Sequence, residues 1–190
     1  WTAIEAQHLG APIPIIEAAV AARNLSADLD TRKNGELVFG PAPEILPEGS
    51  LDLDNLEAAL IAGKILCYAQ GFALLSSANL AFSWSLPLPE IAKVWREGCI
   101  IRSSMLNDMA SALAQTPNKN LMFAPYFVNI LKSKSNALRE VVTTSLAYGL
   151  PIPALASALT YFDMMRTSRS TANMIQAQRD YFGAHSFERF

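Results

Sequence analysis

Apolar residues recur at helical spacing along almost the whole chain. Ile13, Ile16 and Val20 fall on one face of a helix, for example. We expect this helix to continue to about Lys33. No segment alternates apolar and polar residues cleanly over six positions, as a half-buried strand would. The pattern therefore predicts an all-α fold.

Prolines, glycines and one capping sequence mark where further helices begin and end. Residues 34–50 contain three prolines and three glycines, which predicts a surface loop. The sequence Asp54-Asn55-Leu56-Glu57 has the form of a capping box that opens a long helix, ending near Ser83. Further helices are expected at 87–97, 99–114, 118–148 with a break or kink at Pro125, 154–166 and 171–182, the last capped by Gly183. These elements predict a large helical bundle with long central helices.

Two five-residue segments, Gly10–Pro14 and Gly149–Pro153, share the pattern Gly-x-Pro-Ile-Pro. In each segment the Gly follows an apolar helix end and adopts a positive φ easily, and Pro is well tolerated in the first turn of the next helix. These preferences explain two similar turns by themselves. Duplication of a helical unit is the alternative explanation.

Two stretches without charge, Ile65–Pro89 and Val141–Phe162, are long enough to cross a membrane. The first contains six Gln, Asn and Ser residues, and the second is interrupted by the Gly149–Pro153 segment. We therefore expect both to be buried in a soluble core, with no membrane span. The N-terminus shows no secretory signal, and the chain begins at Trp1 instead of Met, so we expect a piece of a longer protein.

Composition indicates a compact protein without a disulfide framework. Of the 190 residues, 51% are hydrophobic and 17% are charged, which suits one domain or a large part of a longer protein. Cys67 and Cys99 lie apart among apolar neighbours, so we expect reduced, buried thiols in a cytoplasmic protein. A net charge of −2 gives no reason to expect nucleic-acid binding.

Signatures of a complete active site are absent from the sequence. The nine glycines contain no Gly-x-Gly pair, which excludes the usual dinucleotide-binding turn. Gly-Lys-Ser/Thr, Gly-x-Ser-x-Gly and His-Glu-x-x-His are also missing, and two His with two Cys do not suggest a zinc site. We therefore expect no complete, self-contained active site in this chain, and no cofactor-binding residue or metal ligand.

The best candidates for binding chemistry are Arg179 and His185. Arg179 offers five donors in a planar fork that suits a phosphate or carboxylate. His185 follows the expected end of the last helix, where a turn can bring its imidazole toward an anion or a hydroxyl. The alternative is an Arg179 paired with Asp180 or Asp163, with His185 in solvent.

Arg23 is the second candidate. It follows Ala18–Ala22, a stretch of small residues that another backbone can approach closely, so its side chain can point into a cleft. The alternative is an ion pair with Asp28 or Glu17 on the helix surface. Residues 61–190 hold twelve bases against seven acids, which suits a small anion but also complementary faces or subunits.

Three segments resemble the 6-phosphogluconate dehydrogenase family, namely residues 90–102, 121–127 and 175–185. The last of them, Ile-Gln-Ala-Gln-Arg-Asp-Tyr-Phe-Gly-Ala-His, is long and unbroken, and Trp1-Thr2 looks like the end of the family's Lys-Gly-Thr-Gly-x-Trp-Thr motif. The family consists of decarboxylating, NADP-dependent enzymes of the pentose phosphate pathway. One departure is Ser170-Thr171, where the family usually has Leu-Pro.

The resemblance implies a homodimer in which residues 1–170 form an all-helical dimerisation and substrate-binding domain, and residues 171–190 form a helix and tail that reach the partner subunit. By this analogy Arg23 and Arg179 bind the phosphate of 6-phosphogluconate, and His185 binds the sugar acid. Arg179 and His185 reach from one subunit into the other's site. The catalytic lysine and glutamate and the NADP-binding domain are expected upstream, so the chain alone is expected to be inactive.

Two alternatives remain open at this point. In the first, the chain is a non-catalytic helical dimerisation module. In the second, it belongs to a related hydroxy acid dehydrogenase with a different substrate. The segment 175–185 favours the 6-phosphogluconate enzymes over the second alternative.

Overall fold

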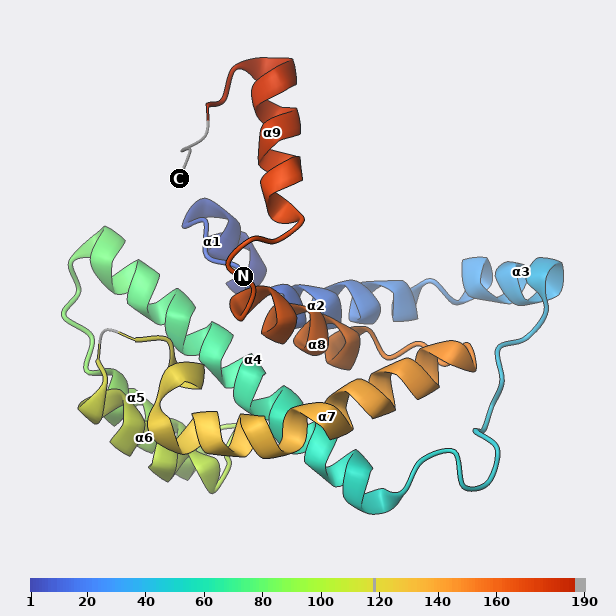
Figure 1. Ribbon diagram of the computed structural model, residues 1–190, viewed down its shortest axis with the longest axis horizontal. Helices are drawn as coiled ribbons and strands as arrows, with labels where there is room; N and C mark the ends of the chain where they lie inside the picture. The colour runs from blue at the N-terminus through green and yellow to red at the C-terminus, as the bar shows by residue number, and fades with distance from the viewer. Residues whose placement is uncertain (118, 187–190) are drawn as a thin grey trace.

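The computed structural model describes residues 1–117 and 119–186, which form nine α-helices and one short 3-10 helix without any strand (Figure 1). The all-α fold predicted from the periodicity is confirmed. The longest helices have 30 and 23 residues. In chain order the elements are α1 (Thr2–His8), α2 (Pro14–Ala27), α3 (Leu29–Phe39), α4 (Leu53–Phe82), α5 (Leu88–Gly98), α6 (Met105–Gln115), η1 (Leu121–Phe123), α7 (Pro125–Ala147), α8 (Pro153–Met165) and α9 (Ala172–Gly183).

The core is built around α4, which packs against α7 and α8 (Figure 1). The middle of α4 is apolar on most sides, and Ile65, Leu66 and Phe72 are at most 1% exposed. A Cβ on Gly63 would lie 2.7 Å from Leu155 Cδ2 of α8, so the missing side chain lets the two helices approach closely. The burial of this helix explains the uncharged stretch in the sequence.

Helix α4 is also long and apolar enough to cross a membrane, and no other helix in the described part of the chain is. Half of its most apolar window is buried inside the protein, as in many core helices. The second uncharged stretch is divided between α7 and α8 by the turn at Gly149–Pro153.

The predicted start of the long helix is wrong in its capping residue. Asp52, instead of Asp54, caps α4, because its carboxylate accepts a hydrogen bond of 2.7 Å from the backbone N–H of Asn55. The predicted end is confirmed, since Ser83 adopts the left-handed conformation directly after Phe82.

The helix predicted to run to Lys33 is broken at Asp28. The backbone of Asp28 leaves the helical conformation, and its carboxylate accepts a bond of 3.3 Å from the N–H of Thr31. An aspartate that caps a new helix competes with continuation of the old one. The chain therefore forms α2 and α3, and the loop predicted at 34–50 begins at Gly40.

Two further helix boundaries differ from the prediction. The helix predicted at 99–114 begins at Met105, because Cys99 is extended after the end of α5 and its successors form an irregular link. Pro125 marks a break between η1 and α7, at the first position of α7, where its missing N–H has no cost. Gly183 is the last residue of α9, and Ala184 adopts the left-handed conformation in its place.

The two Gly-x-Pro-Ile-Pro turns have the same backbone geometry. Gly10 and Gly149 have φ values of +61° and +78°, and the residue after each glycine donates a 2.9 Å hydrogen bond to the carbonyl five residues earlier. Ile13 and Ile152 precede α2 and α8 with φ values of −129° and −128°. The two helices that follow the turns pack against each other. The similarity of the turns is confirmed, and duplication of a whole helical unit stays a hypothesis.

Candidate functional site

Helix α9 stands apart from the helical body. Figure 1 shows it in red, projecting beyond the end of α8, and none of its residues is buried. Exposed apolar side chains on a helix that buries none of its residues are typical of a surface that binds another chain. Four large apolar residues of α9 are between 61% and 84% exposed, namely Met174, Ile175, Tyr181 and Phe182.

Arg179 and His185 line one shallow hollow of about 460 Å³ on α9. Ile175, Gln178 and Phe182 share this hollow, because these positions fall on neighbouring turns of one helix face. The chain turns after Gly183 and places the imidazole of His185 beside the same face. The structure therefore brings two of the three predicted binding residues together.

The alternative pairing of Arg179 with an aspartate is wrong. Arg179 Nη1 donates a 3.2 Å hydrogen bond to Gln176 Oε1, one helical turn earlier. Asp163 is instead engaged by Arg139 through two bonds of 2.6 and 2.8 Å. Among residues 1–117 and 119–186, Arg179 forms no ion pair.

Arg23 lies on a different element, the exposed face of α2. The ion pairs considered for it are absent, because Glu17 accepts a hydrogen bond from Gln7 and Asp28 caps α3. Arg23 does not line the hollow that holds Arg179 and His185. Within one chain, therefore, the third predicted residue is not brought to the other two.

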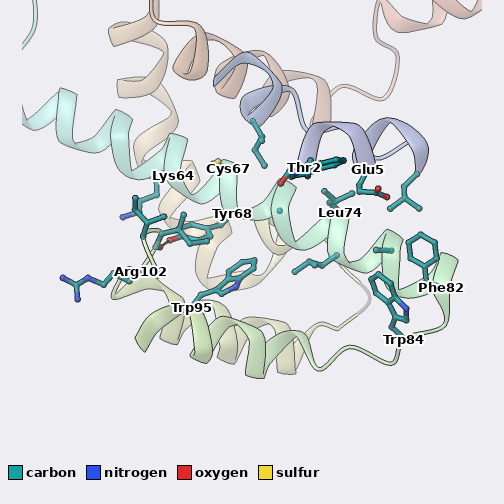
Figure 2. A pocket seen from close by; sticks show the side chains of 18 residues that line it. Thr2, Glu5, Lys64, Cys67, Tyr68, Leu74, Phe82, Trp84, Trp95 and Arg102 are labelled. Carbon is teal, nitrogen blue, oxygen red and sulfur yellow. Dashed lines mark hydrogen bonds between the residues drawn. The ribbon is translucent and has the colours of Figure 1, made fainter. Parts of the chain in front are cut away.

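A cavity of about 800 Å³ lies between α1, α4 and the segment around α5, and sequence analysis did not anticipate it. Its floor is a stripe along α4, and Figure 2 shows Lys64 and Arg102 toward one end and Phe82 and Trp84 at the other. The lining is mostly apolar, so this groove is poorly suited to a sugar phosphate.

Beyond Arg179 and His185, the described residues include thiols, carboxylates and imidazoles. No cluster of three potential metal ligands occurs among them. Cys67 lies at the groove and is half buried, and burial raises the pKa of its thiol. A raised pKa keeps the thiol protonated near neutral pH, and the protonated form is a poor nucleophile.

Sequence analysis missed two residues beside the predicted pair, Gln176 and Asp180. Asp180 Oδ1 accepts a 2.6 Å hydrogen bond from the backbone N–H of Ser186, and Gln176 Nε2 donates a 2.7 Å bond to the carbonyl of the same residue. Both bonds hold the segment that carries His185. Their position inside the unbroken segment 175–185, within one helical turn of Arg179, was a usable signal.

Comparison with known proteins gives one consistent result. The family model described as 6-phosphogluconate dehydrogenase, C-terminal domain, matches residues 1–190. Two Bacillus subtilis proteins, the NADP(+)-dependent and the NAD(+)-dependent decarboxylating 6-phosphogluconate dehydrogenases, are each 43% identical over 100% of this chain and 41% of their own length. The chain thus spans about two fifths of the length of the curated relatives that it matches.

A solved structure supports the same relationship at the level of the fold. This structure is of the Plasmodium falciparum 6-phosphogluconate dehydrogenase, described in its apo form, with its cofactor NADP+ and with its substrate 6-phosphogluconate. It matches with a TM-score of 0.91 and 37% identity, over 100% of this chain and 42% of the solved chain. The helical architecture and the whole length of the sequence agree with one family, and the chain belongs to the 6-phosphogluconate dehydrogenase C-terminal domain family.

Proposed function

We propose that this chain is the dimerisation and substrate-binding part of an enzyme that oxidatively decarboxylates 6-phosphogluconate to ribulose 5-phosphate and CO2, with reduction of NADP. The names of the relatives support the reaction and its substrate. The observation from this chain that carries the proposal is the shared hollow of Arg179 and His185, on a helix that buries nothing in its own chain.

The substrate site is assembled from two subunits in this proposal. Arg179 of one subunit and the partner subunit's Arg23 bind the phosphate, and His185 hydrogen-bonds the sugar acid. A single exposed ion pair contributes only about 0–1 kcal/mol, so one surface arginine binds a phosphate weakly. Two guanidinium groups in a cleft closed by the partner bind the doubly charged group more strongly, because less water screens them. Substrate binding therefore depends on dimerisation.

The coenzyme is not assigned to any residue of this chain. The described residues contain neither a strand nor the Gly-rich strand-to-helix turn that holds a dinucleotide pyrophosphate, so they do not fit NADP. The NADP- and NAD-dependent relatives are equally identical to this chain. We therefore place the choice between the two coenzymes outside these 190 residues.

Mixed dimers of the full-length enzyme that contains this chain test the proposal. Arg23→Ala and Arg179→Ala should each raise the KM for 6-phosphogluconate by about 10- to 100-fold, because each removes a hydrogen bond between charged groups. A dimer of one Arg23→Ala subunit and one Arg179→Ala subunit should regain about half of the wild-type activity, because the two mutations fall into one site and leave the other intact.

The control is Arg169→Ala, which removes an exposed arginine from the segment that precedes α9. It should leave KM unchanged. Mixed dimers without any recovery of activity would show that Arg23 and Arg179 do not share a site across subunits. If light scattering shows a dimer and titration shows that this dimer does not bind 6-phosphogluconate, the non-catalytic dimerisation module is favoured.

A further inference from the structure

We propose that Gln176, Asp180 and Gly183 are positioning residues that hold Arg179 and His185 in a fixed relative arrangement within one subunit. This inference rests on the proposed function of those two groups. The substrate-binding surface of α9 is then ordered before it meets the other subunit. Three independent contacts in the described part of the tail carry the argument.

The first contact is the side-chain amide of Gln176, which joins both binding groups. Its Oε1 accepts a 3.2 Å hydrogen bond from Arg179 Nη1. Its Nε2 donates a 2.7 Å bond to the carbonyl of Ser186, the residue after His185. A planar amide with a donor and an acceptor on its two sides thus couples the guanidinium to the backbone next to the imidazole.

The second contact is the carboxylate of Asp180, which accepts a 2.6 Å hydrogen bond from the backbone N–H of Ser186. Ser186 is therefore held through its N–H and its carbonyl by two side chains of α9. Ala184 and Ser186 have φ values of +50° and +56°, a region that residues with a Cβ disfavour. The two side-chain bonds offset that cost and keep the chain folded back at the end of the helix.

The third contact explains why Gly183 is a glycine although it is helical. A Cβ at this position would lie 2.8 Å from both Cδ2 and Nε2 of His185. The imidazole occupies the space that any side chain at residue 183 would need. Gly183 has no positive φ, and the absence of a side chain there leaves the imidazole this place beside the helix.

If Arg179 and His185 are held in place before the substrate binds, less conformational entropy is lost on binding. The site then presents a guanidinium and an imidazole at a set separation, suited to a ligand with an anionic end and a hydroxyl-bearing end. Ile175 and Phe182 on the same face are exposed and free to meet the other subunit.

Kinetics of the full-length enzyme test this role. Gln176→Ala and Asp180→Ala should each raise the KM for 6-phosphogluconate about 3- to 10-fold, less than the loss of a binding group itself, with kcat changed less than about 2-fold. Asp180→Asn keeps an acceptor oxygen and should restore most of the wild-type KM. Gly183→Ala should raise KM as well, because it displaces His185. The matched control is Asn173→Ala, an exposed polar residue in the first turn of α9, which should leave KM unchanged.

Amide hydrogen exchange in the 190-residue chain tests the geometry without any enzyme activity. The N–H of Ser186 should exchange at least about 10-fold more slowly than in Asp180→Ala, and Asp180→Asn should retain most of this protection. Rapid exchange of Ser186 in the wild-type chain would overturn the proposal. It would also be overturned by an unchanged KM in Gln176→Ala and Asp180→Ala when Arg179→Ala raises KM. An unchanged KM in Arg179→Ala would instead overturn the proposed function, and the role of the positioning residues with it.

Discussion

Helices α2 and α8 begin with the same turn and differ in burial. Counted from the two turns in the same register, Ala19 and Val20 of α2 correspond to Ala158 and Leu159 of α8. The α8 pair is 0% and 8% exposed, whereas Ala19 is exposed and Val20 is 37% exposed. The two helices therefore share a local structure but not a packing environment.

The difference arises from the neighbouring helix. α8 lies against α4, where Ala158 Cβ is 4.0 Å from the position that a Cβ of Gly63 would take. The described residues place no comparable helix over Ala19 and Val20. An exposed apolar strip next to a well-packed counterpart is typical of a surface that another segment or subunit covers. Local sequence determines the turn, and long-range packing determines what the following helix buries.

The largest expected difference between the two helices is the loss of stability when the corresponding residues Leu159 and Val20 are replaced by Ala. Leu159→Ala should lower the free energy of unfolding by about 2–4 kcal/mol, because it opens a cavity in the core. Val20→Ala should cost less than about 1 kcal/mol, because its side chain is already partly in water. Urea unfolding of the 190-residue chain measures both, and equal costs would refute the comparison.

A second difference lies in the first turn of each helix. Gln70 of α4 is fully buried, and its Oε1 accepts a 3.1 Å hydrogen bond from the backbone N–H of Ile15 in α2. No side chain in the described part of the chain does the same for Ala154 of α8. Gln70→Leu should lower the free energy of unfolding by about 1–3 kcal/mol, because it leaves a buried N–H without a partner. The exposed control Gln115→Leu should change it by less than about 0.5 kcal/mol, and a similar loss in both variants would contradict this role.

The two Gly-x-Pro-Ile-Pro turns should lose similar amounts of stability when their glycine is replaced by Ala. Gly10→Ala and Gly149→Ala should each cost about 1–2 kcal/mol, because both glycines have positive φ and neither site crowds a Cβ. Gly35→Ala in α3 is the control of opposite sign, and it should stabilise by up to about 1 kcal/mol through helix propensity. Thermal unfolding compares the three variants. If Gly10→Ala and Gly149→Ala lower the stability by amounts that differ beyond the measurement error, the two turns are not physically equivalent.

The smallest effect concerns the ion pair that joins α8 to α7. The hydrogen bonds from Arg139 lower the pKa of Asp163, and Arg166 adds to the effect. A lowered pKa stabilises the folded chain above the ordinary pKa of the carboxyl, and this contribution is lost as pH falls below about 4. The corresponding residue of α2 is Asn24.

Asp163→Asn gives α8 the residue that α2 has at this position. The variant should lose about 0–1 kcal/mol at pH 7, because the pair is partly exposed. Urea unfolding at pH 7 and pH 3 should show the two proteins converging at the lower pH. If the stability difference between the wild-type chain and Asp163→Asn grows as the pH falls, the lowered pKa of Asp163 does not stabilise the folded chain.

Much of the helical framework was predictable from local sequence. The long uncharged stretch indicated α4, and prolines indicated where α7 and α8 begin. Both signals act within one or two helical turns, so they can be recognised without the tertiary structure. The break at Asp28 was missed, because a carboxylate competing for a backbone N–H does not alter the apolar period. The late start of α6 was missed for a similar reason, since no proline separates residues 99–104 from the helix that follows.

The candidate site was predictable in part. Arg179 and His185 were found from the segment 175–185, and they lie together because the helix ends between them. Gln176 and Asp180 lie in the same segment, but their bonding partners were not predicted, because these bonds depend on the tail turning back by way of two residues with positive φ.

The sequence by itself determined the all-α class, the two glycine turns and the identity of the groups able to bind an anion. Each of these depends on residues within a few positions of one another, where backbone preferences and side-chain chemistry act directly. Tertiary structure decided which copy of the turn leads into the core, through the packing of α8 on α4, and left no residue of α9 buried. These features depend on contacts between distant segments, whose geometry no local pattern encodes.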